Sequence, residues 1–313
     1  MTISQLLLHG AQWLNEYALW IMVAAAALAC AAEWFTNTRR NEPQVRTTTS
    51  RWLIAWRINT ALLVIALAIS WTLAPWLSPL FSQALSAKSG LLVHLAPLGV
   101  GGPNDTAHIV LGIFLLDLLT YLMHRAMHAV PLLWRIHQVH HNDADMNAST
   151  HFRQHPAQML LVLSVQLPAL WLLGISGASW VLYATISLIA QLWQHSVLGC
   201  SVRAERYLSW LLVTPRVHRT HHDQRRHFHD ANYGAIFSLW DRLFATVRRA
   251  PDELRLGLES PPHVARPNLL NLLLLPFTPK PAAPAARVLA VAPARRNNKL
   301  QPKKFHSQHQ GKT

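Results

Sequence analysis

The strongest constraint on the fold is a series of apolar runs long enough to cross a lipid bilayer. The hydrocarbon core of a membrane is about 30 Å thick, and about 20 mostly apolar helical residues span it. Such runs occupy residues 17–35, 58–77 and 109–123, and two shorter ones occupy 159–175 and 180–193. The two short runs are separated by Ser-Gly-Ala-Ser and predict a tight helical hairpin, with full crossing by each half left open. The sequence therefore predicts an all-α fold, a polytopic membrane helical bundle.

Basic residues lie almost entirely on one side of these runs. If the N-terminus is outside, 27 of the 28 Lys and Arg face the cytoplasm, and only Lys88 does not. Cytoplasmic loops carry such an excess, so we expect an integral protein of a bacterial inner membrane with a cytoplasmic C-terminus. No cleavable signal peptide is expected, because no positively charged segment precedes Tyr17. This topology, with anionic lipid, explains the net charge of +14 without nucleic acid as a partner.

The chain divides into three segments of different composition. Residues 1–106 are expected to hold N-terminal transmembrane helices and an extracytoplasmic loop, and residues 107–250 further transmembrane helices with histidine clusters. Residues 251–313 form a basic tail rich in Pro and Ala, which we expect to be largely disordered because it has no periodic apolar face. The two cysteines, Cys30 and Cys200, are far apart and offer neither a disulfide framework nor a thiolate metal site.

Three histidine clusters stand at the predicted cytoplasmic ends of the apolar runs. They read His-Arg-Ala-Met-His at 124–128, His-Gln-Val-His-His at 137–141 and His-Arg-Thr-His-His at 218–222. Residues three and four apart share a helix face, so each cluster projects two or three imidazoles toward one point. With 19 histidines in 313 residues, random placement gives about 0.07 occurrences of His-x-x-His-His, and the chain has two. We therefore predict a metal site in a cytosolic, histidine-rich helical cap.

Eight clustered imidazoles exceed the ligands that one ion binds, so the pattern favours two ions. Sulfur ligands, the His-Glu-x-x-His pattern of zinc proteases and the Glu-x-x-His pairs of soluble di-iron bundles are missing from the clusters. Two other functions stay open. A zinc-dependent membrane hydrolase would need a carboxylate base near the ion. A non-catalytic metal-binding or transport protein would need polar groups along a path through the bilayer.

A polar stripe leads from the third apolar run into the first cluster. Asp117, Tyr121, His124 and His128 are spaced four, three and four residues apart and share one helix face. An ionisable residue inside a membrane run is costly, and a functional role is the default expectation. We expect Asp117 to accept a hydrogen bond from a ligand imidazole, or else to bind the ion. The alternative is a buried aspartate whose partners are Tyr121 or backbone groups.

An ordered set of motifs extends from Asp117 to Val247. Besides the stripe and the three clusters, the set contains Asn147, Thr150, Arg153, His155-Pro156, Gln194-His195, Thr214-Pro215-Arg216, Asn232-Tyr233-Gly234 and Trp240-Asp241-Arg242-Leu243-Phe244. In this set the sequence resembles the fatty acid hydroxylase superfamily, also called the sterol desaturase family, of integral membrane di-iron enzymes. It departs from the pattern at Ala245, where many members have Gly, and at Gln191, where some have His.

The resemblance implies two iron ions at the cytoplasmic face, with O2 as co-substrate, that hydroxylate or desaturate a membrane lipid. Carried over by position, it implies ten iron ligands: His124, His128, His137, His140, His141, His155, His195, His218, His221 and His222. Asp117, Tyr121 and Asp241 complete the predicted catalytic set. For His155 the alternative is a histidine that fixes the turn before Pro156.

Further expectations concern partners and neighbouring residues. No flavin motif, haem domain or cysteine-rich segment is present, so we expect electrons from an external reductase chain. Arg153 or Arg216 is expected to hold an anionic lipid headgroup, unless each pairs with a loop carboxylate. His151, His227 and His229 are expected to be solvated loop residues. The sequence names neither the lipid, nor the carbon attacked, nor the oligomeric state.

Overall fold

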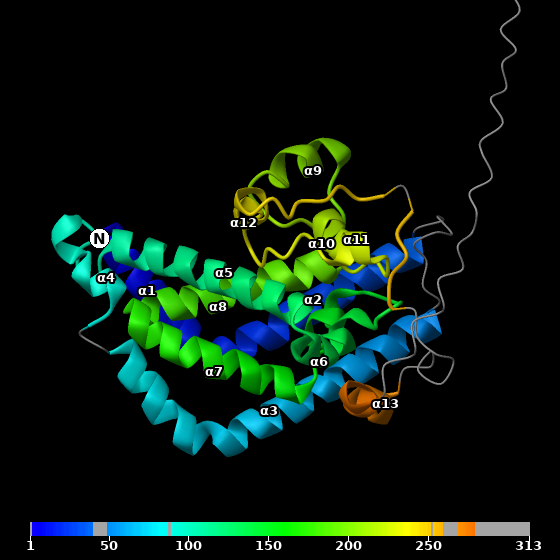
Figure 1. The fold of residues 1–313 in the computed structure, drawn as a ribbon, viewed down its shortest axis with the longest axis horizontal. Helices are drawn as coiled ribbons and strands as arrows, with labels where there is room; N and C mark the ends of the chain where they lie inside the picture. The colour runs from blue at the N-terminus through cyan, green and yellow to red at the C-terminus, as the bar shows by residue number, and fades with distance from the viewer. Residues whose placement is uncertain (1, 40–48, 87–88, 252, 259–267, 279–313) are drawn as a thin grey trace, which may run out of the picture. The chain divides into compact units, whose positions relative to one another are not determined.

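The computed structural model describes residues 2–39, 49–86, 89–251, 253–258 and 268–278. Its long helices are α1 (Ile3–Glu16), α2 (Ala18–Arg39), α3 (Thr49–Leu85), α5 (Thr106–Ala129), α7 (Pro156–Leu173) and α8 (Gly177–His195) (Figure 1). Its short helices are α4 (Leu91–His94), η1 (Ala96–Leu98), α6 (Pro131–His141), η2 (Ala148–Phe152), α9 (Val202–Leu208), α10 (Pro215–His221), α11 (Arg226–His229), α12 (Leu239–Leu243), α13 (Leu269–Leu274) and η3 (Leu275–Phe277). The described residues contain no strand beyond two isolated bridges, so the predicted all-α fold is confirmed.

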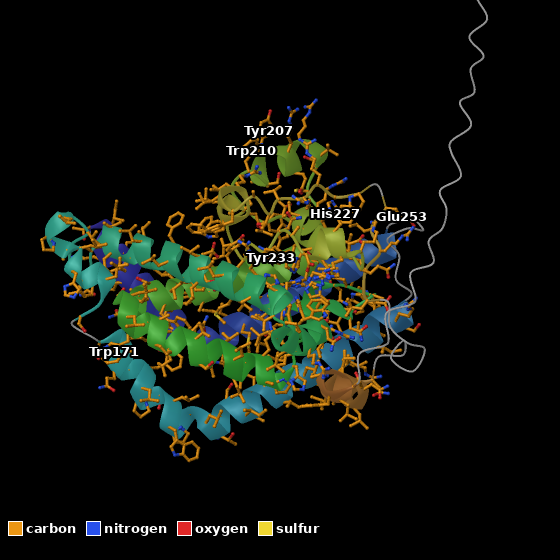
Figure 2. All side chains as sticks on the ribbon, in the orientation of Figure 1. Trp171, Tyr207, Trp210, His227, Tyr233 and Glu253 are labelled. Atoms are coloured by element: carbon orange, nitrogen blue, oxygen red, sulfur yellow. The ribbon has the colours of Figure 1, made fainter. Side chains whose placement is uncertain are left out.

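Four helical segments are long and apolar enough to cross a membrane. They are Ala18–Thr36, Ser50–Leu85, Thr106–Ala129 and Pro156–Leu173, and each contains or overlaps one of the first four predicted runs. The fifth run lies in α8, which follows α7 as the second half of the predicted hairpin. Large apolar side chains are exposed on these helices, Trp171 of α7 among them (Figure 2). Such surfaces suit contact with lipid, and the chain is a polytopic membrane protein.

Local sequence explains the hairpin of α7 and α8. Pro156 stands in the first turn of α7, where its missing N–H costs nothing. The helix ends at Gly174, whose φ of +67° lies in the left-handed region that favours glycine. Ser176 then caps α8 by accepting a hydrogen bond from Ser179 N. Buried His108 of α5 donates from Nε2 to the Gly174 carbonyl over 3.0 Å, which ties the hairpin to α5.

α3 has 37 residues and curves along its length in Figure 1. Pro75 and Pro79 lie inside it, and each removes a backbone donor, which bends a helix. Near the other end of α3, buried Asn59 donates through Nδ2 to Asp143 Oδ2 (3.3 Å) and to Ser149 Oγ (2.9 Å). These bonds attach α3 to the segment that follows α6.

Arg153 is enclosed, with 1% of its surface exposed. Its guanidinium donates to Oδ1 of Asn59 and to the backbone carbonyls of Val139 and Asn142. Arg153 therefore joins α3 to α6, and it has no surface left for the lipid headgroup that the sequence suggested. Arg216 is exposed on α10, and its contact with a headgroup stays a prediction.

Part of the segment predicted to be a disordered tail is folded. Residues 268–278 form α13 and η3, which begin where Asn268 caps the helix by accepting a hydrogen bond from Asn271 N. Leu272 and Leu275 pack with Leu62 of α3 and Val139 of α6. The cause is a run of leucines that the tail's overall composition conceals. Residues 279–313 lie outside the described residues.

Glu33 attaches α2 to the rest of the bundle. Its side chain is fully buried, and its Oε1 accepts hydrogen bonds from Ala148 N (2.9 Å) and Val197 N (3.0 Å). The two donors precede and follow the α7–α8 hairpin. One carboxylate oxygen thus fixes three segments that are far apart in the sequence.

We expect Glu33→Leu to lower the midpoint of thermal unfolding in detergent, because two buried N–H groups lose their acceptor at about 1–3 kcal/mol each. Glu33→Gln keeps an amide oxygen at the same place and is the matched control, with a smaller loss. Equal midpoints for the wild type and Glu33→Leu would contradict this role.

Candidate metal centre

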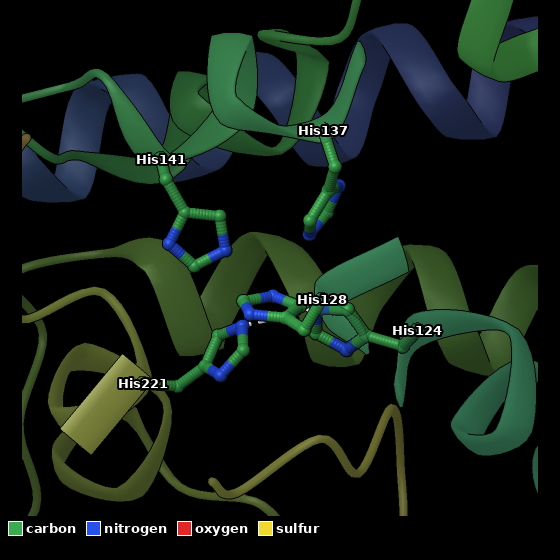
Figure 3. A group of neighbouring side chains, drawn as sticks. All are labelled: His124, His128, His137, His141 and His221. Atoms are coloured by element: carbon green, nitrogen blue, oxygen red, sulfur yellow. Dashed lines mark hydrogen bonds between the residues drawn. The ribbon is translucent and has the colours of Figure 1, made fainter. Parts of the chain in front are cut away.

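Nine histidines converge in two adjacent groups. The first group comes from α5, α6 and α10 and is shown in Figure 3: His124, His128, His137, His141 and His221. The second group comes from α6, α8 and α10 with its cap residue: His140, His195, His218 and His222. Within each group, every residue offers a ring nitrogen within 4.8 Å of those of the others. The structure thus brings together all the predicted ligands except His155.

The helical period explains how neighbouring histidines reach different groups. At about 100° per residue, helix residues four apart point within about 40° of each other, whereas consecutive residues point about 100° apart. His137 and His141 therefore reach the first group, and His140 reaches the second. The adjacent His221 and His222 are divided between the groups in the same way. Each His-His pair thus contributes one imidazole to each group.

Two ring nitrogens of the first group face each other with no hydrogen between them. His124 Nδ1 lies 2.9 Å from the Tyr233 carbonyl oxygen, and His221 Nδ1 lies 2.7 Å from that of Ala231. A carbonyl only accepts, so each Nδ1 carries the single hydrogen of a neutral imidazole. The two Nε2 atoms, 2.9 Å apart, then present lone pairs to each other. A cation between them removes this repulsion, so the residues fit a bound metal ion.

In the second group, His195 is held in the same way, with Nδ1 bonded to a backbone carbonyl and a lone pair on Nε2. Its Nδ1 donates to the Gln191 carbonyl over 2.6 Å, which leaves a lone pair on Nε2. That Nε2 lies 3.1 Å from His140 Nε2 and 3.0 Å from His218 Nε2. Two imidazoles at right angles on an ion, with bonds of about 2.1 Å, have nitrogens about 3 Å apart. The spacing therefore suits ligands that share one ion.

Burial keeps these imidazoles neutral. Loss of solvation lowers the pKa of His137 to about 3, and burial together with neighbouring imidazoles lowers the pKa of His141 and His222 well below the ordinary value. Neutral imidazole is the form that binds a metal. His128 Nδ1 lies 3.5 Å from Asp230 Oδ1. Both ring nitrogens of His222, and Nε2 of His128, lack a hydrogen-bond partner among the described residues. Buried polar atoms of this kind are costly unless an ion satisfies them.

Asp117 holds the loop that supplies the carbonyls. Its carboxylate accepts hydrogen bonds from Ile236 N (3.0 Å), Phe237 N (3.2 Å) and Trp240 Nε1 (2.8 Å). These donors follow Tyr233, whose carbonyl orients His124. Asp117 therefore acts on the backbone rather than on a ligand imidazole, in line with the alternative weighed from the sequence.

Asp241 and Tyr121 act on the same loop. Asp241 accepts hydrogen bonds from Tyr233 N (2.8 Å) and Gly234 N (2.9 Å), and a Cβ at Gly234 would lie 2.9 Å from Asp241 Oδ2. Tyr121 OH shares a 2.9 Å hydrogen bond with Thr246 Oγ1, which donates to Asp241 Oδ1 over 2.7 Å. Among the described residues, no predicted catalytic side chain hydrogen-bonds an imidazole. All three are positioning residues.

His155 lies outside both groups. It is the N-cap of α7, where Nδ1 accepts from Ala157 N (3.1 Å) and Nε2 donates to the Leu273 carbonyl (3.2 Å). It thus fixes the turn before Pro156, which was the alternative expectation, and we leave it out of the proposed ligand set. Sequence reasoning missed Gln158, whose Oε1 accepts from His137 Nδ1 over 3.0 Å. An amide two residues after Pro156, at the edge of an apolar run, was its only signal.

Two histidines expected to be solvated are half-buried. His151 lines the cavity beside the second group, and burial lowers its pKa to about 4. His229 stacks on Trp134 with ring centroids 5.3 Å apart. His227 is exposed on α11, as expected. Packing of η2 against α8, where the His151 and His195 ring centroids are 6.1 Å apart, accounts for the burial of His151, and packing against α6 accounts for that of His229.

A cavity of about 270 Å³ adjoins both groups and is walled by α5, α7 and α8. Its lining includes His124 and His137 of the first group and His140, His195 and His218 of the second. Other lining residues are Met123, Val162, Gln166, Tyr183, Leu188 and Gln191. Among the described lining residues, none carries a carboxylate, ammonium or guanidinium group. The cavity therefore suits an uncharged group placed beside the histidines.

Fold and site together define a class of protein: a polytopic membrane bundle whose helix ends carry a paired histidine centre able to hold metal ions. Residues 109–246 match the fatty acid hydroxylase family. The resemblance inferred from the motifs is thereby confirmed for this part of the chain.

Similar proteins modify lipids. The chain is 30% identical to alkylglycerol monooxygenase of Homo sapiens over 147 residues, 47% of this chain and 32% of the relative. It is 28% identical to ornithine lipid hydroxylase of Rhizobium tropici over 144 residues, 46% and 42% of the two chains. It is 27% identical to lathosterol oxidase of Mus musculus over 173 residues, 54% and 56%. The chain spans about a third of the length of the alkylglycerol monooxygenases it matches. No solved structure matches it.

We expect Asp241→Ala to weaken metal binding about 10- to 100-fold, the usual effect of losing a group that orients ligands. Without that carboxylate, the Tyr233 carbonyl that holds His124 is free to move. Competition with a chelator measures the affinity. Asp105→Ala, at the far end of α5, is the control and should bind like the wild type. An unchanged affinity in Asp241→Ala would refute the positioning role.

Metal content distinguishes ligands from neighbours. We expect two ions per chain in the wild type, about one in His222→Ala, which removes a ligand of the second group, and two in His155→Ala. Elemental analysis of protein purified in detergent gives these ratios. Equal losses in both variants would contradict the assignment of His155 to helix capping.

Proposed function

We propose that the protein is a membrane-bound non-haem di-iron oxygenase that hydroxylates or desaturates a lipid. It would use O2 as co-substrate, with electrons from an external reductase chain. Bound iron would supply the activation of O2 and the oxidation of an unactivated C–H bond. In hydroxylation, one oxygen atom enters the lipid and the other leaves as water, with two electrons and two protons from the donor.

The facing lone pairs of His124 and His221 carry this proposal. They call for a cation in a site built only from nitrogen ligands, and the site lies within the residues that match the fatty acid hydroxylase family. Imidazole suits iron, and two groups of ligands suit two ions. The similarity to lipid-modifying oxygenases supports the same chemistry.

The chain's own residues bind and orient the reactants. The carbonyls of Ala231, Tyr233 and Gln191 hold the hydrogens of three imidazoles on Nδ1, so that each Nε2 is free to bind an ion. The cavity places an uncharged segment of lipid against the histidines and keeps bulk water away from the reacting carbon. Within its wall, Tyr183 OH donates to Thr120 Oγ1 over 2.6 Å, and Thr120 Oγ1 donates to the Leu116 carbonyl over 2.9 Å, so the hydrogens of both hydroxyls have acceptors.

The alternatives are less well supported. A zinc-dependent hydrolase requires a base beside the metal-bound water. The described cavity lining contains no carboxylate, and Asp230, whose Oδ1 lies 3.5 Å from His128 Nδ1, is paired through Oδ2 with Arg226. A metal transporter requires polar groups along a route through the bilayer, whereas the nine imidazoles gather in one place. We also propose that the centre lies at the cytoplasmic face of a bacterial inner membrane, as the distribution of Lys and Arg favours.

Lipid analysis under ¹⁸O2 tests the proposal. In cells that express the wild type we expect a lipid that gains one ¹⁸O atom, or one that loses two hydrogens if the reaction is desaturation. His140→Ala should abolish the product, because it removes a ligand of the second group. His227→Ala changes an exposed histidine outside both groups and should retain the product.

Identical lipid profiles for the wild type and His140→Ala, with both proteins present in the membrane and the wild type loaded with iron, would overturn the proposed activity. Zinc in the purified protein, with turnover that does not depend on O2, would favour the hydrolase instead.

A further inference from the structure

Exposed apolar side chains gather on the short helices that follow α8. We define the α9–α12 face as six residues of α9, α12 and the turn at 209–212. They are Val202, Tyr207, Trp210, Leu211, Leu239 and Leu243, with 86, 73, 64, 58, 42 and 66% of their surface exposed. Figure 2 labels Tyr207 and Trp210 at the outer end of this segment. Clustered apolar surface of this kind marks contact with a protein or a membrane.

Two aromatic contacts with α5 indicate how deep in the bilayer the α9–α12 face lies. Phe237 stacks on Phe114 with ring centroids 4.8 Å apart, and Phe244 stacks on Tyr121 at 5.3 Å. α12 lies between these two contacts and therefore runs beside the middle of α5. At 1.5 Å per residue, the two positions on α5 lie about 12 and 23 Å from its first residue. In a hydrocarbon core of about 30 Å that begins at this residue, the first position lies just short of the midplane and the second lies in the leaflet nearer the histidine centre.

The backbone N–H and C=O groups of this segment have hydrogen-bond partners within the protein, as a lipid environment requires. Non-helical chain is tolerated at membrane depth only where its polar groups have partners. Here Val213 N donates to the Ile236 carbonyl (2.9 Å) and Ser238 N to the Leu211 carbonyl (3.0 Å). The Ile236 and Phe237 amides donate to Asp117. These backbone groups therefore do not need water as a hydrogen-bond partner.

Charge and ring chemistry fit the boundary between lipid and water. Arg203 and Arg206 are exposed on α9, beside Tyr207. Arg242 donates to the Ser209 carbonyl over 2.9 Å and lies over the Trp210 ring, 4.1 Å from its centroid. Tyr and Trp prefer the headgroup level of a bilayer, and exposed arginines attract anionic lipid.

We propose that the α9–α12 face lies in the bilayer, in the leaflet on the side of the histidine centre. Its occupant is lipid: acyl chains against Leu211, Leu239 and Leu243, and anionic headgroups at Arg203 and Arg206. The segment after α8 is then a re-entrant part of the membrane domain, not a part of the cytosolic cap. This inference rests on α5 as a membrane span and does not depend on the proposed oxygenase activity.

Spin labels measure the depth directly. In the full chain with Cys30 and Cys200 replaced by serine, single labels are placed at Leu211, Leu243 and control positions, and the protein is reconstituted in nanodiscs containing phosphatidylglycerol. Val64 of α3, 57% exposed within a candidate span, is the lipid-facing control, and exposed His227 is the water-facing control.

We expect labels at 211 and 243 to collide several-fold more often with O2 than with a water-soluble nickel chelate, as at 64, and the reverse at 227. Nickel accessibility at 211 and 243 equal to that at 227 would overturn the proposal. Low accessibility to both reagents, with dipolar broadening between labels, would assign the face to a second copy of the chain and would overturn it equally. Two independent label positions guard against one variant that fails to fold.

Discussion

A neutral imidazole carries a hydrogen on only one of its two ring nitrogens, and the metal centre depends on which nitrogen that is. In His124, His221 and His195 the hydrogen is on Nδ1, because Nδ1 donates a hydrogen bond to the backbone carbonyl of Tyr233, Ala231 and Gln191, respectively. The Nε2 lone pairs of His124 and His221 then face each other at 2.9 Å, a separation that two such lone pairs do not adopt without a cation or a proton between them. The Nε2 lone pair of His195 points toward His140 and His218. Burial disfavours the proton. Hence the arrangement of backbone around the centre selects a metal ion.

The carbonyls must themselves be fixed, and two buried carboxylates do this. Asp117 on α5 and Asp241 on α12 together accept hydrogen bonds from four backbone amides between 233 and 237. A buried carboxylate is costly unless it has such donors, so each carboxylate and the loop stabilise one another. Gly234 is required because a side chain there would meet the Asp241 carboxylate. Through Asp117, α5 thereby helps to orient His124, which it also carries, although the Asp117 carboxylate does not contact the imidazole.

The same helices link the centre to lipid. α5 and α8 carry His124, His128 and His195 at their ends, and with α7 they wall the uncharged cavity. A substrate drawn from the bilayer would thus remain between apolar helices until it meets the imidazoles. Glu33 and Arg153 join α2 and α3 to the segments on either side of the α7–α8 hairpin, which fixes the outer helices around this cavity.

The sequence by itself determined the helical spans, the clusters and the family. The length of an apolar run and the spacing of histidines are local properties of the sequence. The helical period of 3.6 residues then tells which of these residues lie on the same helix face. Only the tertiary structure decided the partners across long separations: Tyr233 for His124, Ile236 for Asp117, and Leu273 for His155. It also divided the imidazoles into groups of five and four, enclosed Arg153, and placed α12 beside α5. The physical reason is that hydrogen-bond partners and burial depend on which segments meet, and no periodicity within one segment contains that information.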